Sequence, residues 1–271
     1  MRRFLIVALM SVCLGLLADE ALLEEVVRGG ALLCPNVSAE FQVGNGTVAR
    51  SQVFTDRPVQ ENTVVVNWKL GEWGRVGFLH WDMNMLSGRV DNLGRRPFME
   101  TDWGLFYGYD WQLAEDWTLS NEAMVYWMCY HGMKVEAPTD IEYDFSQSLA
   151  NPYATPYWRL RCGTATPSGW LHATVGLKRS FEVCDRLTLT PSVFCGIGNG
   201  TMMAIRSVED PHSSLMDVNV QLRADVPLNE QVGIFCLVRQ FTAMSHGLRD
   251  VYGKPHPRDL TIGALGVTVN F

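Results

Sequence analysis

The sequence predicts an all-β protein: an antiparallel, transmembrane, up-and-down β-barrel of about 12 strands. Three features of the 271-residue chain predict this fold: an N-terminal apolar run with the form of a signal peptide, an alternation of apolar and polar residues over many segments, and a last strand that ends in Phe271. Alternating segments of about ten residues, separated by turns, are typical of transmembrane barrels. A soluble β-sandwich also alternates, but its strands are usually about five or six residues long.

The first 18 residues are expected to be a signal peptide (1–18). Arg2 and Arg3 form a short basic region, an apolar stretch follows over 4–17, and Ala18 is a small residue at the expected cleavage site. The apolar stretch is too short to cross a bilayer as a helix, which needs about 20 residues. The signal peptide and the alternation together predict a protein exported to the outer membrane of a Gram-negative cell.

The mature chain is expected to form one domain. A short helical, periplasmic segment is expected over 19–36 and the outer-membrane β-barrel over 37–271. No second apolar run of 18 residues occurs, which excludes helical membrane spans. Removal of the signal peptide takes away two of the 22 basic residues and none of the 29 acidic ones, leaving a net charge of −9. A nucleic-acid partner is therefore not expected, because phosphate binding needs a basic surface.

The cysteines indicate neither a metal site nor a cofactor. Six remain after removal of the signal peptide, and in an exported protein they are candidates for disulfides. Four fall on the apolar faces of expected strands, and we interpret them as small hydrophobic side chains. They are Cys129, Cys162, Cys195 and Cys236. No CxxC pair or His/Cys cluster suggests a metal site, and no cofactor is expected.

Alternation defines the expected strands. From Val218 to Val226, for example, every second residue is apolar and the residues between are polar or charged, which gives one apolar and one polar face. Twelve strands are expected, at 37–55, 62–70, 74–83, 101–112, 117–131, 139–147, 154–164, 168–183, 186–199, 214–227, 230–243 and 258–271. The sixth, at 139–147, rests on Ile141, Tyr143 and Phe145.

The connections sort by length onto the two ends of the barrel. Tight turns are expected at 71–74, 114–116, 184–185 and 227–229, and long loops at 84–100, 200–213 and 244–257. Bacterial barrels have an even number of strands, short periplasmic turns and long outer loops. Without the sixth strand the count is odd and the two kinds of connection no longer fall on opposite ends.

Aromatic residues mark the membrane surfaces and the end of the chain. Trp103 and Trp111 lie eight residues apart on one face of one strand. That is about 26 Å along the strand, or about 20 Å along the membrane normal at the usual tilt, which suits two aromatic belts. The alternative is that both are core tryptophans. The final strand, which ends in Phe271, is similar to those recognised by the outer-membrane insertion machinery, so this machinery and outer-membrane lipid are the expected partners.

The order of strands and turns also resembles a known family. The segments VARSQVFTDRPVQ (48–60), GEWGRVGF (71–78) and ETDWGLFYGYDW (100–111), followed by NEAMVYWMCYHG (121–132) and TDIEYDF (139–145), resemble the TorF-like porin family. The resemblance covers about 100 residues of the first half of the chain. It implies an outer-membrane barrel with no defined catalytic residues. The family pattern would place a glycine near Gln52, which this chain lacks.

The polar faces predict a porin-like channel for small polar solutes or ions. Acidic residues are expected on the fourth and fifth strands and basic residues on strands seven to eleven, across a closed barrel, so that opposed walls favour polar solutes. The expected pore-lining residues are Glu40, Lys69, Asp102, Asp110, Glu122, Arg159, Arg161, Lys178, Arg223 and Asp225, with Arg239 a further candidate. The alternative is a plugged, structural barrel in which these charges pair with one another.

A second alternative is an outer-membrane hydrolase with a site at the rim. Its candidates are His80 with Asp82, which share a face at i, i+2, and His131 at the outer end of the fifth strand. Ser245 and His246 are adjacent and would point to opposite faces, which makes them a poor nucleophile–base pair. No GxSxG motif occurs. The chain is not expected to be an enzyme.

Overall fold

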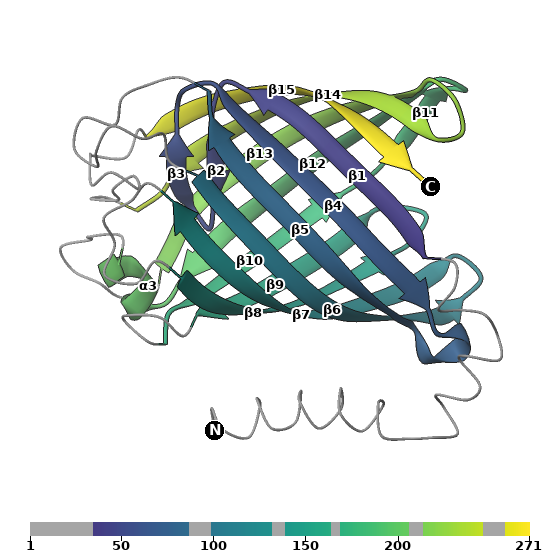
Figure 1. Ribbon diagram of the computed structural model, residues 1–271, viewed down its shortest axis with the longest axis horizontal. Helices are drawn as coiled ribbons and strands as arrows, with labels where there is room; N and C mark the ends of the chain where they lie inside the picture. The colour runs from purple at the N-terminus through teal and green to yellow at the C-terminus, as the bar shows by residue number, and fades with distance from the viewer. Residues whose placement is uncertain (1–34, 87–98, 132–138, 164–168, 206–213, 246–257) are drawn as a thin grey trace.

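The computed structural model describes residues 35–86, 99–131, 139–163, 169–205, 214–245 and 258–271 (Figure 1). Within these ranges the chain forms a closed antiparallel barrel with 12 crossing strands, as the sequence predicts. The strands are β1 (Asn36–Gly44), β4 (Val59–Lys69), β5 (Arg75–Met85), β6 (Met99–Ala114), β7 (Trp117–His131), β8 (Thr139–Ala150), β9 (Thr155–Gly163), β10 (Leu171–Lys178) with its continuation β11 (Phe181–Cys184), β12 (Leu187–Gly198), β13 (Ser214–Pro227), β14 (Val232–Ala243) and β15 (Asp259–Asn270). The expected signal peptide (1–18) and residues 19–34 of the expected helical segment lie outside the described residues, whereas Asn36, the last residue of that segment, begins β1.

The first and last strands close the barrel. β1 pairs with β15, from Ser38 opposite Asn270 to Gly44 opposite Ala264. Beyond this ladder the Phe271 amide donates to the Val37 carbonyl at 2.8 Å, and the Val37 amide donates back at 3.1 Å. Closure leaves no strand edge unpaired, which a strand in lipid requires because no water is there to bond its backbone.

The two ends of the barrel differ as expected. The short-turn end carries the 3-10 helix η1 (Gly71–Trp73) and the tight turns after Ala114, Cys184 and Pro227. The opposite, outer end carries the longer connections and the helix α3 (Gly200–Ile205). The sixth predicted strand is confirmed as β8, so the even strand count holds. Among the described residues, no helix has the length and apolar character needed to cross a membrane.

The outer face of the barrel is apolar. Val220, midway along β13, is 60 % exposed, and Leu265 of β15 is 67 % exposed. Trp103 and Trp111 are both exposed, so the alternative that they are core tryptophans is wrong. Cys236 pairs with Leu265 on this outer face, and the five cysteines of the described residues are free. The alternation in the sequence thus separates the outward face from the inward one.

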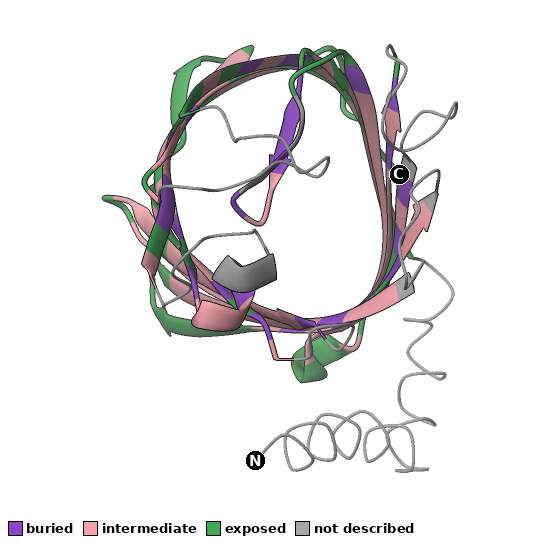
Figure 2. Ribbon diagram, turned by 90° about the vertical axis from the view of Figure 1, so that its left-hand side faces the viewer, coloured by how far each residue is buried: buried purple, intermediate pink, exposed green. Residues whose placement is uncertain are grey.

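The first predicted strand, 37–55, is wrong. β1 ends at Gly44, and the chain then forms a separate two-stranded hairpin from β2 (Thr47–Ala49) and β3 (Gln52–Thr55). Figure 2 shows this inner hairpin projecting into the barrel. Asn45 ends the strand: its side-chain oxygen accepts from the Gly263 amide at 2.8 Å and its side-chain nitrogen donates to the Thr261 carbonyl at 3.2 Å. The side chain thereby pairs with β15 where the backbone turns inward.

Substitution of Val220 by arginine tests the outward face. Val220→Arg should lower the free energy of unfolding in lipid vesicles by about 2–4 kcal/mol, because a charge on the lipid face finds neither water nor a partner. Gln221→Glu is the matched control, since it places a charge one residue along in the lumen, opposite Arg239. The control should cost less than about 1 kcal/mol. A larger loss in Gln221→Glu than in Val220→Arg would mean that the strand register is shifted by one residue.

Deletion of Phe271 tests closure. The deletion removes both backbone hydrogen bonds to Val37 and the terminal aromatic ring, so the fraction of protein that assembles should fall. The measurement is the heat-modifiable band on a gel, which reports the closed barrel. Phe271→Tyr keeps the backbone and an aromatic ring and should assemble like the wild type. A deletion variant that assembles with unchanged yield would contradict a role for the terminal residue.

Candidate functional site

The inner hairpin, residues 47–55, determines the shape of the lumen. It connects β1 to β4, projects into the barrel (Figure 2) and turns at Arg50 and Ser51. The φ angles of these two residues are 50° and 61°, in the left-handed region that favours glycine. Left-handed backbone at a residue other than glycine costs about 1–3 kcal/mol and persists only where surrounding contacts hold it. Contacts of the tip with the barrel wall must therefore stabilise this turn.

The base of the hairpin packs into an apolar part of the lumen. Val48 and Val53 form a buried cluster with Phe241 of β14 and Ile262 of β15. Ala49 packs against a second cluster, formed by Val59, Met83 and Met85. A third cluster lies on β6 and β7 and consists of Phe106, Met124, Tyr126 and Met128. The alternation suggested that the inward face is polar throughout. Part of this face is instead apolar, because an inserted hairpin needs apolar partners to pack against.

Arg50 reaches across the lumen into three carboxylates on the far wall. Its Nε donates to Oε2 of Glu142 at 2.5 Å, while Nη1 lies 3.6 Å from Oε1 of Glu100 and Nη2 lies 3.9 Å from Oδ2 of Asp102. We call Glu100, Asp102 and Glu142 the acidic cradle. Burial lowers the pKa of Arg50, but the surrounding groups, Glu142 foremost, together raise it by more, so this pKa lies above its ordinary value. Arg50 is therefore charged, and the ion pairs join the hairpin to β6 and β8.

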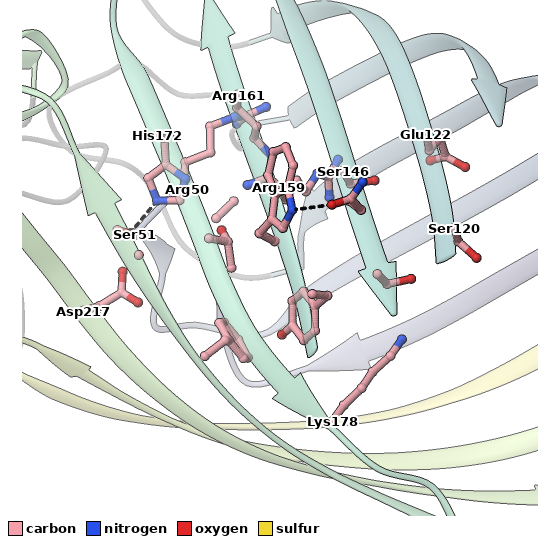
Figure 3. Close-up of a pocket in the computed structure, with 18 of the residues that line it drawn as sticks. Arg50, Ser51, Ser120, Glu122, Ser146, Arg159, Arg161, His172, Lys178 and Asp217 are labelled. Atoms are coloured by element: carbon pink, nitrogen blue, oxygen red, sulfur yellow. Dashed lines mark hydrogen bonds between the residues drawn. The ribbon is translucent and has the colours of Figure 1, made fainter. Parts of the chain in front are cut away.

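Ser51 attaches the tip to the neighbouring part of the wall. Its hydroxyl lies 2.8 Å from Nε2 of His172 on β10 (Figure 3). Asp217 of β13 lies on the other side of the same hydroxyl. Gly196 of β12 leaves the space for this contact, because a Cβ there would lie 2.0 Å from the Ser51 hydroxyl oxygen. Arg239 of β14 adds a bond from its Nη1 to the Val48 carbonyl at 3.3 Å.

A cavity of about 490 Å³ lies between the hairpin and the short-turn end of the barrel. Arg50 and Ser51 bound it on one side, and Ser120 and Lys178 line it nearer the short turns (Figure 3). Arg75 of β5 also lines it. We call it the lumenal cavity. Four of the ten predicted pore-lining residues border it, namely Glu122, Arg159, Arg161 and Lys178. Among the described residues, no group of three or more His, Cys, Asp or Glu side chains is placed to hold a metal ion.

The charges of the lumen are paired locally and not separated into two walls. Arg159 and Arg161 of β9 contact Asp144 of the neighbouring strand β8, and Arg161 also lies 3.7 Å from Glu142. Arg75 of β5 bonds Asp110 at 2.7 Å and lies 3.4 Å from Glu122. Acidic residues therefore lie beside the basic ones on the same part of the wall, which the sequence alone did not indicate.

The other six predicted residues do not line the cavity. Arg223 bonds both Glu40 and Asp225 at 2.9 Å, which joins β13 to β1 past the intervening strands β14 and β15. Lys178, which borders the cavity, lies with its Nζ 5.9 Å from the centre of the Tyr157 ring. Lys69 is exposed at the last residue of β4, at the short-turn end. Asp102, predicted to line a pore, instead lies in the acidic cradle beside Arg50.

Several residues of the site were not predicted. The inward position of Glu142 and Asp144 can be predicted from the sequence. The two residues alternate with the apolar residues of the same strand, Ile141, Tyr143 and Phe145. The inward position of Arg75 can be predicted from the alternation in the same way. The positions of Arg50 and Ser51 cannot, because the expected strand 37–55 places both residues in the barrel wall. The contacts of His172 and Asp217 depend on the hairpin and were therefore missed with it.

Comparison with known proteins bears on the fold. No family model matches the chain, and no curated protein matches its sequence. Among solved structures, the NanC porin overlaps with a TM-score of 0.50 at 8 % identity, over 88 % of this chain and all (100 %) of that one. An outer membrane channel from Pseudomonas putida F1 overlaps with a TM-score of 0.50 at 10 % identity, over 88 % of this chain and 95 % of the other. The fold is that of an outer-membrane β-barrel. Identities this low show the fold alone.

The rim pair His80 and Asp82 lies on the outside of this outer-membrane barrel. The His80 ring stacks on Trp103, which is exposed on the outer face, with a centroid distance of 4.1 Å. Its Nε2 lies 3.3 Å from Oδ2 of Asp82, and Asn62 and Asn84 each donate to Oδ1 of Asp82 at 2.8 Å. Within the part of the chain that the structure describes, the side chains that donate to Asp82 are amides, which are not nucleophiles. The side chain of His131 lies outside the described residues.

Alanine at Gly196 tests the attachment of the hairpin tip. Gly196→Ala places a methyl group against the Ser51 hydroxyl, so the bond to His172 must break. The free energy of unfolding in urea should fall by about 1–3 kcal/mol, the cost of leaving buried polar groups without partners. Gly263→Ala is the control, because a Cβ there meets nothing within 4 Å. Equal stability of the two variants would contradict the docking of Ser51 against this wall.

Proposed function

We propose that this protein is an outer-membrane channel of the porin type, which passes small polar solutes or ions through a lumen narrowed by the inner hairpin. The observation that carries the proposal is the lumenal cavity: about 490 Å³ lined largely by charged and hydroxyl side chains, inside a closed barrel whose outer face is apolar. Water and polar solutes are stable in such a space, whereas lipid is stable only outside it.

The hairpin divides the proposed path into two parts. On the outer side its base packs against apolar residues of the wall, and on the inner side its tip forms the boundary of the cavity. Solutes would pass the hairpin where Arg50 and Ser51 meet the far wall. The ten residues expected from the sequence as pore-lining belong to this proposal, and Arg75 and Arg239 join them as residues that border the cavity.

Further parts of the proposal rest on the sequence. The signal peptide at 1–18 and the short segment at 19–36 would bring the chain to the insertion machinery, and Phe271 would be recognised there. The relation to the TorF-like porins rests on the segment from Val48 to Gln60 and those that follow it. We do not propose an enzyme, because the hydrogen-bond partners that the described residues supply to the outward His80–Asp82 pair, Asn62 and Asn84, are not nucleophiles.

Ion conductance in a planar bilayer tests the channel. The refolded protein should give a steady conductance, and Lys178→Glu should shift the reversal potential in a potassium chloride gradient towards cation selectivity. Lys178 borders the cavity, and no ion pair with a carboxylate is found for it among the described residues. Arg186→Glu in an exposed turn is the control and should leave selectivity unchanged. Absence of any conductance from correctly assembled protein would show a plugged barrel and reject the proposal.

A further inference from the structure

Two neighbouring rows of residues cross the wall of the lumenal cavity from β7 to β10. In the first row, Ser120 of β7 lies opposite Ser148 of β8, Ser148 lies opposite Tyr157 of β9, and Tyr157 lies opposite Gly176 of β10. A Cβ at Gly176 would lie 2.5 Å from Cζ and 2.6 Å from the hydroxyl oxygen of Tyr157. The end of the Tyr157 ring therefore lies over β10, and the ring leans along the wall.

The second row lies two residues further along each strand. It consists of Glu122, Ser146, Arg159 and Thr174, in order from β7 to β10, and all four line the cavity (Figure 3). Residues two apart in a strand share a face, so the two rows form one continuous surface. We call these two rows the hydroxyl wall, because five of their side chains end in a hydroxyl group, namely Ser120, Ser146, Ser148, Tyr157 and Thr174.

The hydroxyl wall suits a solute that itself carries several hydroxyl groups. A hydroxyl group offers one donor and two acceptor positions, so it can bond another hydroxyl group in either direction. No hydrogen bond joins any of the five hydroxyl groups to another residue within the described part of the chain. The wall extends over four strands, about 14 Å at the usual strand spacing. This is far wider than a single carboxylate or phosphate group, and it favours a sugar.

Lys178 adds a cation at the β10 side of this wall. It lies two residues after Gly176 on the same face of β10, and its Nζ lies 5.9 Å from the centre of the Tyr157 ring. The side chain is exposed, lines the cavity and forms no ion pair with a carboxylate of the described residues. An ammonium group only donates hydrogen bonds. Lys178 therefore needs a ligand with an acceptor, which a neutral sugar supplies weakly and a carboxylate supplies well.

Arg159 adds a second cation beside the same ring. Its Nε and Nη2 contact Asp144, and Nη2 also donates to the Tyr126 hydroxyl at 3.0 Å, so both hydrogens of Nη1 remain for a ligand. The side chain of Arg159 is 33 % exposed and that of Asp144 is 3 % exposed. The cation of this ion pair thus faces the cavity while its carboxylate is covered.

We propose that the hydroxyl wall binds a sugar that carries a carboxylate group, such as a hexuronate. The carboxylate bonds Lys178 and Arg159, and the sugar hydroxyl groups bond the serine side chains of β7 and β8. Glu122, at the β7 edge, accepts from a sugar hydroxyl group and repels the carboxylate, which fixes the orientation. The proposal deepens the proposed function by naming the class of solute, and it rests on that function for passage. Binding itself requires only the closed barrel.

Saturation-transfer NMR of the refolded barrel with D-glucuronate tests the site, with empty micelles as the blank. D-glucose lacks the carboxylate, and tetrahydropyran-2-carboxylate keeps the ring and the carboxylate without the hydroxyl groups. Each should bind at least about tenfold more weakly than D-glucuronate, because each loses one of the two kinds of contact.

Variants of the wall separate the two kinds of contact. Lys178→Gln should weaken D-glucuronate binding about tenfold and leave the weaker D-glucose binding unchanged. Ser148→Ala combined with Tyr157→Phe removes two hydroxyl groups, keeps the aromatic ring and should weaken the binding of both sugars. Arg186→Gln in an exposed turn is the control and should bind like the wild type. Each variant is first shown to migrate as an assembled, heat-modifiable barrel.

Any of these results would overturn the proposal: no binding of D-glucuronate to the assembled wild type, equal binding of D-glucose, equal binding of tetrahydropyran-2-carboxylate, or unchanged D-glucuronate binding in Lys178→Gln. The channel proposal is separable from this one. If the assembled barrel binds D-glucuronate but gives no conductance, the channel proposal fails while the hydroxyl-wall proposal stands. A barrel that conducts ions but does not bind D-glucuronate would give the reverse.

Discussion

The requirement that every backbone amide and carbonyl be paired in lipid determines this structure. It is met by closing the sheet, and the closing contact is the ladder between β1 and β15 with the terminal bonds between Val37 and Phe271. Once the sheet is closed, alternate residues must face lipid, so those positions are apolar, as Val220 and Leu265 show. The inward positions are free of this constraint. They carry the charged side chains and the contacts to the inner hairpin.

The inner hairpin organises those inward positions. Its apolar base requires apolar wall residues such as Phe241, and its charged tip requires the acidic cradle on the opposite side. Adjacent residues Arg50 and Ser51 contact different strands, β6 and β8 on one side and β10 on the other. The turn conformation, the space beside Gly196 and the acidic cradle therefore depend on one another. Removal of the hairpin tip would leave polar groups of the wall without these partners. The cavity exists because the hairpin bounds it.

The barrel was predictable from the sequence, and the arrangement inside it was not. A period of two reports which residues share a face, so the outward position of Val220 and the inward position of Asp102 follow from the pattern. The apolar residues Val37, Ala39, Phe41 and Val43 lie at odd positions, and this period stops at Gly44, where β1 ends. The turn at Arg50 lacks the glycine that marks most tight turns, so the hairpin that follows is not marked in the sequence. Ion pairs such as Arg161 with Asp144 depend in addition on the strand register, which no single strand encodes.

The central claim is that the hairpin lies inside an otherwise conducting barrel. Single-channel conductance of the wild type, compared with a variant in which residues 47–55 are replaced by a short glycine–serine linker, tests it most directly. The account predicts a measurable conductance for the wild type and a severalfold higher one for the variant, because the segment that narrows the lumen is gone. Equal conductance of the two would contradict the account, since the hairpin would then not obstruct the path.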